Sequence, residues 1–132
     1  MGAWGHNSFE NDDALDWVAD LEESQDMSAI LKALNAVTDE AGDYIEAPEC
    51  SMAIAAAEVV AALCGNAASS LPDEVNEWLK GKPKPDPQLA AKARQAIDVI
   101  LADSELKELW EEIEEDYPKW IAVLEDIKSR LP

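Results

Sequence analysis

The strongest constraint on the fold is an apolar run in the middle of the chain. Between Glu49 and Cys64 nearly every side chain is apolar, and six of these residues are alanines. A helix that is apolar on all sides is stable in water only where other elements surround it. The run is too short to span the roughly 30 Å of a membrane interior, and Glu58 interrupts it. We therefore expect a core helix over about 49–64.

On both sides of this run, apolar residues recur at helical spacing, and no long period-2 alternation occurs. The pattern predicts an all-α fold: an irregular bundle of six or seven short helices around the central one. At 132 residues, one domain over 1–132 is expected. Residues 1–10 form an ordered arm in this scheme, and the basic, Pro-rich stretch 80–87 forms a loop. The flanking helices are expected at about 12–23, 28–42, 72–79, 87–102, 104–113 and 116–130.

Local signals support these boundaries. Asn11 is a favourable N-cap, followed by acids in the first turn. Asp86 with Pro87 is a similar start, and Gly65 before Asn66 is a typical stop for the central helix. Because alanines leave space between helices, the five tryptophans are the expected fillers of the core.

The two cysteines are expected to be reduced and structural. Cys50 and Cys64 lie 14 positions apart along the expected helix, or roughly 21 Å, which no disulfide spans. The first nine residues show neither a basic segment nor an apolar run typical of a secretory signal. We therefore expect a cytoplasmic protein.

Charge is distributed unevenly along the chain. Residues 1–79 hold 17 acids and one base, Lys32, whereas 80–132 hold 12 acids and nine bases, within a net charge of −19. Such a field repels nucleic acids and anionic membranes and attracts basic proteins or cations. We expect a basic protein partner, no nucleic acid and no membrane. The sequence leaves the oligomeric state open.

No catalytic or cofactor motif is present, so no catalytic residue is assigned and no cofactor is expected. The lone His6 is interpreted as a surface or packing residue. Asp12 and Asp16 share one helix face and are candidate ligands for a hard cation, although acids in a first turn also serve as helix caps. Glu58 is the most informative acid, because a buried carboxylate requires a partner. We expect Arg94, Lys92, a tryptophan indole or the backbone of the arm to supply this partner. The alternative is that Glu58 is a perturbed carboxylate in a functional pocket.

Two stretches resemble a family of short bacterial proteins of unknown function. The opening residues 1–17 match its pattern M-G-x-W-G-x-x-x-F-x-N-D-x-A-x-D-W, and residues 46–58 match a second pattern, E-A-P-E-x-x-x-A-x-A-A-A-E. The resemblance carries no activity or substrate to transfer. It draws attention to a set of candidate binding or structural residues: Trp4, Phe9, Asn11, Asp12, Asp16, Trp17, Glu46 and Glu58.

Three functional hypotheses follow. The first is a non-catalytic acidic module that binds a basic protein, as inhibitors and immunity proteins do. The alternative is a small-ligand or divalent-cation binding domain, or an enzyme, with a pocket near Glu58 and the arm. The third is a homo-oligomer subunit whose acidity provides solubility.

Overall fold

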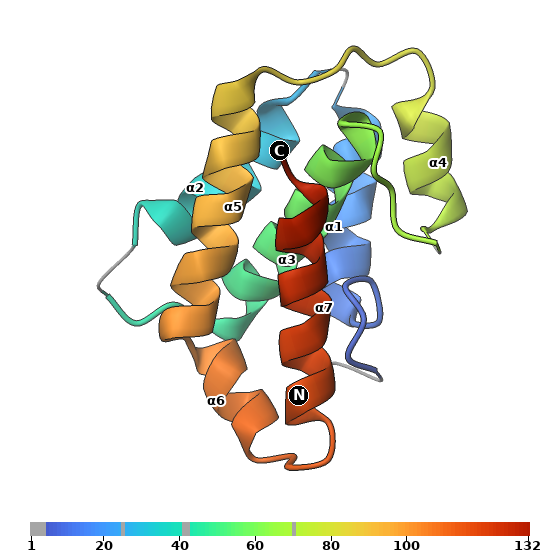
Figure 1. Cartoon of the computed structure of the whole chain (residues 1–132). Coiled ribbons are helices and arrows are strands. Elements are labelled where there is room, and N and C mark those ends of the chain that lie inside the picture. The colour runs from blue at the N-terminus through green and yellow to red at the C-terminus, as the bar shows by residue number, and fades with distance from the viewer. Residues whose placement is uncertain (1–4, 25, 41–42, 70) are drawn as a thin grey trace.

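The computed structural model describes residues 5–24, 26–40, 43–69 and 71–132. In these residues the chain forms seven α-helices and no strand (Figure 1), which confirms the all-α prediction. No helix among them is long and apolar enough to cross a membrane. The helices are α1 (Asp12–Glu23), α2 (Ser28–Thr38), α3 (Ala47–Leu63), α4 (Asp73–Leu79), α5 (Pro87–Ala102), α6 (Glu105–Glu111) and α7 (Tyr117–Arg130).

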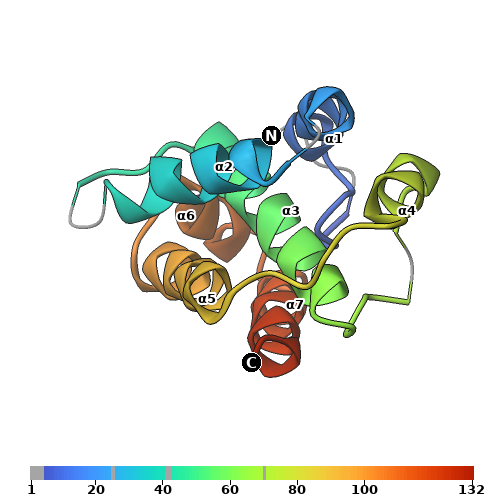
Figure 2. The ribbon, with the colours of Figure 1, turned by 90° about the horizontal axis from the view of Figure 1, so that it is seen from above.

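Helix α3 is the centre of the bundle, as the apolar run predicts. It contacts all six other helices, and Figure 2 shows it enclosed between α1, α2 and α4 on one side and α5, α6 and α7 on the other. From Ala53 to Ala61 every residue is buried, and Glu58 is the only charged one among them. The alanines on this helix allow neighbouring backbones to approach closely, so larger side chains must fill the remaining space.

Tryptophans occupy that space. Trp17, Trp78, Trp110 and Trp120 are each buried, and Trp4 lies outside the described residues. The rings of Trp110 and Trp120 stack with centroids 6.5 Å apart, which ties α6 to α7. Burying such large rings is a major part of the hydrophobic stabilisation of a small bundle.

The predicted caps are present. The Asn11 side chain accepts from the Ala14 N–H at 2.8 Å, and that of Asp86 accepts from the Leu89 N–H at 2.9 Å. Gly65, with φ of +91°, ends α3. There the N–H of Asn66 donates to the Ala61 carbonyl and that of Gly65 to the Ala62 carbonyl, the reciprocal arrangement of a Schellman motif.

Three boundaries differ from the expected positions. Helix α2 ends at Thr38, not near Gly42, which lies outside the described residues; the Glu40 N–H there donates to Val37 in a tight turn. Helix α3 begins at Ala47, because a proline in the first turn loses no helical hydrogen bond. Helix α6 ends at Glu111, which leaves Ile113 in the connection and partly exposed.

Both thiols are free, as expected. Cys50 is buried in α3, and desolvation raises the pKa of its thiol to about 11. Cys64 follows the last helical residue of α3 and is half-buried, and desolvation raises its pKa as well. Neither thiol is therefore activated as a nucleophile.

Candidate functional site

A cleft of about 970 Å³ opens where four segments meet. The arm borders it with residues 6–10, α3 with Glu58, the connection before α4 with residues 67–69 and 71–72, and α7 with four side chains from Lys119 to Asp126 as well as Arg130. Phe9 packs against the hydrophobic core at this point. The pocket expected near Glu58 and the arm is thus formed by segments distant in sequence.

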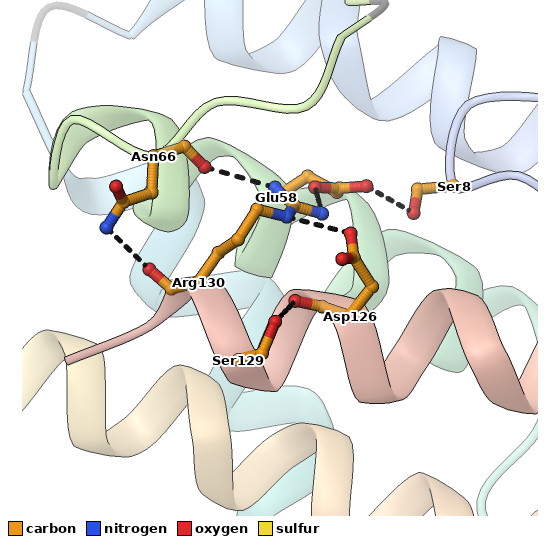
Figure 3. A network of polar contacts seen from close by, with 6 residues as sticks. All are labelled: Ser8, Glu58, Asn66, Asp126, Ser129 and Arg130. Atoms are coloured by element: carbon orange, nitrogen blue, oxygen red, sulfur yellow. Dashed lines mark hydrogen bonds and ion pairs between the residues drawn. The ribbon is translucent and has the colours of Figure 1, made fainter.

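The Glu58 carboxylate lies in the wall of this cleft, and each of its two oxygens accepts a hydrogen bond (Figure 3). The Ser8 hydroxyl donates to Oε2 at 2.8 Å, and a guanidinium N–H of Arg130 donates to Oε1 at 2.8 Å. The Glu58 side chain is only 6% exposed and that of Arg130 16%. A buried carboxylate is tolerated here because a cation and a hydroxyl replace the water that it loses.

Arg130 also binds two further groups. Its Nε donates to Asp126 Oδ2 at 2.9 Å, and another guanidinium N–H donates to the Asn66 carbonyl at 3.2 Å. In return, the Asn66 amide donates to the Arg130 carbonyl at 3.0 Å. Burial lowers the pKa of Arg130, but the hydrogen bonds and charges of Glu58 and Asp126 together outweigh this effect and raise the pKa. The network joins the arm, α3 and α7.

Arg94 and Lys92 were predicted as partners of Glu58, and that prediction is wrong. The arm does supply a partner, but through the Ser8 side chain and not through its backbone. Arg94 instead donates to the carbonyls of Lys128 at 2.8 Å and Leu131 at 3.0 Å. Lys92 donates to Asn35 at 2.6 Å. Helix α5 presents these cations to the C-terminus and to α2, whereas α7 runs past Glu58 and brings Arg130 to it.

The candidate residues do not converge on one site. Asp12 and Asp16 are exposed on α1, and neither lines the cleft. Glu46 precedes α3 at the end opposite Glu58, roughly 18 Å away along the helix. Trp17 lies in the core, and its indole donates to the Ala29 carbonyl at 3.3 Å.

In the described part of the chain, no group of three His, Cys, Asp or Glu side chains is placed so that it could hold a metal ion. His6 borders the cleft and is half-buried.

Four residues of the network were not identified from the sequence: Ser8, Asn66, Asp126 and Arg130. One signal existed for Arg130. The chain contains only two arginines, Arg94 and Arg130, and arginine is the preferred partner of a buried carboxylate. That preference alone leaves two arginines as candidates, and the packing of α7 against α3 places Arg130 at Glu58.

A second hollow lies between α1 and α2, with a volume of about 680 Å³. Both helices pack more extensively on α3 than on each other. Five of the buried and half-buried residues that line it are apolar, Trp17, Ala29, Ala33, Ala36 and Met52, and the sixth is Ser24. Its exposed margin carries Asp20, Glu23, Asp26, Ser28 and Lys32. We call this hollow the α1–α2 groove.

Helix α1 carries an acidic stripe, which we define as Asp12, Asp16, Asp20 and Glu23. All four side chains are exposed. Their spacing of four, four and three residues places them along one helix face. Among the described residues, no basic side chain forms an ion pair with any of them.

Comparison with known proteins gives one match. No curated protein and no solved structure matches the chain significantly. A family described as a domain of unknown function, DUF4259, matches residues 2–122. That range includes Ser8 and Glu58 but ends before Asp126 and Arg130. The resemblance inferred from the two sequence patterns is thereby confirmed, and the chain belongs to the DUF4259 family.

Proposed function

We propose that this protein is a non-catalytic interaction module that binds a basic protein partner through the acidic stripe on α1, in the manner of an inhibitor or immunity protein. The observation that carries the proposal is that the four carboxylates of the stripe are exposed and without a cationic partner within the described residues. The fold therefore does not use these charges in ion pairs.

The rest of the charge pattern supports this interpretation. Asp12, Asp16 and Asp20 follow one another at intervals of four residues, where like charges repel and destabilise a helix. All but two of the carboxylates in the six ion pairs come from residues 80–132. A row of unpaired acids that costs stability is consistent with a role in binding, since complementary charge accelerates association.

The test begins with affinity capture of tagged protein from its native host at low salt. The variant Asp16→Asn/Asp20→Asn/Glu23→Gln removes three charges from the stripe. The matched control Glu112→Gln/Glu114→Gln/Glu115→Gln removes three exposed charges from the connection between α6 and α7. We expect a basic protein to be captured by wild type and control, and to be reduced with the stripe variant.

Purified partner then gives the decisive measurement. We expect the association rate to fall about tenfold or more between low and physiological salt, and the stripe variant to lose most of that dependence. Equal rates for the stripe variant and the control would contradict the proposal, as would a partner without basic character.

The cleft beside Glu58 favours a second candidate function, binding of a small organic ligand. Its volume of about 970 Å³ and its mixed lining of Phe9, His6 and Lys119 support this alternative. Thermal-shift screening of metabolites tests it, with Ala122→Trp as the cleft-filling control. A ligand that stabilises wild type but not Ala122→Trp would support the second function; no shift with any compound would count against it.

A further inference from the structure

We propose that the α1–α2 groove binds one amphipathic helix of a partner protein, with lysine or arginine on one side and apolar side chains on the other. The inference rests on the proposed function and adds the place and the shape of the partner's contact. It follows from the combination of an apolar floor, an acidic margin and a fixed geometry.

The floor is suited to a helix. Ala29, Ala33 and Ala36 lie on one face of α2, at spacings of four and three residues. Small side chains let a second helix approach closely, while Trp17 and Met52 provide a larger apolar surface. From Ser28 to Ala36 the groove follows α2 for about 12 Å, or roughly two turns of a bound helix.

The margin selects the charge of the occupant. The margin carries three acids, Asp20, Glu23 and Asp26, and one cation, Lys32. The acidic residues gather where α1 leads into α2, and Lys32 lies farther along α2. A bound helix with its basic side chains near the acids and a neutral or acidic end near Lys32 matches this distribution.

The acidic end of the groove is held in place by hydrogen bonds. The Trp78 indole of α4 donates to the Ser24 carbonyl at 2.8 Å. The Asp26 carboxylate accepts from the Ser28 N–H at 2.9 Å and from the Ser24 hydroxyl at 3.2 Å. A site organised before binding loses less entropy when its partner arrives.

The probe for the experiment is a fluorescein-labelled amphipathic peptide of Leu, Ala and Lys, about 15 residues long, so that it exceeds the length at which isolated helices are marginal. A peptide of the same composition in alternating order and one with Glu in place of Lys are the peptide controls. Binding is measured by fluorescence polarisation, and then repeated with the captured partner.

Three protein variants separate the contributions. Ala36→Trp fills the groove without changing charge and is expected to weaken binding about tenfold or more, as loss of a central contact does. Asp20→Asn/Glu23→Gln is expected to weaken it about threefold, because exposed charges contribute little each. Lys32→Gln removes the opposing cation and is expected to strengthen it about twofold.

Ala91→Trp is the matched control, since Ala91 is exposed on α5 and does not line the groove; its binding should equal that of wild type. Circular dichroism verifies the fold of each variant, and Ala36→Gln replaces Ala36→Trp if the larger side chain unfolds the protein.

The outcomes distinguish the two proposals. If the stripe variant loses the partner but Ala36→Trp binds it as wild type does, the groove is overturned and the proposed function stands. If neither probe nor partner responds to charge, both are overturned. Equal affinity for the alternating peptide would overturn the helical occupant. Self-association that Ala36→Trp abolishes would also overturn it, because a second copy would then fill the groove.

Discussion

The cleft beside Glu58 and the α1–α2 groove use charge in opposite ways. In the cleft, Glu58, Arg130 and Asp126 satisfy one another within the fold. At the α1–α2 groove, Asp20 and Glu23 have no cationic partner among the described residues. Paired charges in the wall of a cleft contribute to the stability of the fold, whereas unpaired charges beside an apolar floor are available to another molecule.

Removal of Arg130 is expected to have the largest effect on the paired charges of the cleft. Arg130→Ala leaves the buried Glu58 without its cation, so we expect a loss of about 3 kcal/mol in unfolding free energy. Urea unfolding followed by circular dichroism measures it. Lys80→Ala is the control, because the pair of Lys80 and Glu77 is about 70% exposed on both sides and should contribute little. A variant Arg130→Ala as stable as wild type would show that the pair does not hold the fold.

A smaller effect is expected from Ser8, which joins the arm to the same network. Ser8→Ala removes the donor to Glu58 Oε2, and we expect a loss of about 1.5 kcal/mol. Limited proteolysis should also cut the arm faster. Ser69→Ala, an exposed position on the same cleft, provides the control. Unchanged proteolysis and stability in Ser8→Ala would mean that the hydrogen bond to Glu58 does not hold the arm.

The unpaired side should respond with the opposite sign. Asp16 lies four residues from both Asp12 and Asp20, so Asp16→Asn relieves repulsion and should stabilise the protein by about 0.5 kcal/mol. Added salt screens the same repulsion. Thermal unfolding at low and high salt should therefore show a smaller salt effect in Asp16→Asn than in wild type. Destabilisation by this change would indicate that the stripe supports the fold after all.

The smallest expected effect concerns the labelling rates of the two thiols. Desolvation raises the pKa of Cys50 to about 11, so we expect no labelling of this thiol in the folded protein at pH 8. Cys64 lies at the end of α3 beside Asn66, and Arg130→Ala should accelerate its labelling several-fold by loosening the network.

Between pH 9 and 11 the raised pKa of Cys50 also implies a loss of stability, because the unfolded thiol releases its proton first. Cys50→Ala should remove that part of the alkaline dependence. Urea unfolding at pH 9 and 11 measures this dependence. For the labelling experiment, mass spectrometry of alkylated protein gives the rates, and a Cys50 thiol that is labelled as fast as Cys64 would contradict the burial of Cys50.

Much of the fold could be predicted because its signals are local. The apolar run identified α3 as the central helix, and Asn11, Asp86 and Gly65 marked helix ends through hydrogen bonds to residues at most four positions away. The errors arose where local signals were weak. The apolar spacing of α2 gives no sign of where the helix ends. Ile113 continues the apolar spacing of α6, although the helix itself ends at Glu111.

From the sequence alone it follows that Glu58 would be buried and would need a partner, and that the net negative charge would be concentrated in the first 79 positions, where 17 acids accompany a single base. Both follow from the cost of burying charge and from composition. Only the tertiary structure decided that the partner is Arg130, 72 residues away, and that Trp17, Ala33 and Met52 meet in one groove. Such contacts depend on how α1, α2 and α7 pack around α3, and helical periodicity specifies which face is buried but not which neighbour covers it.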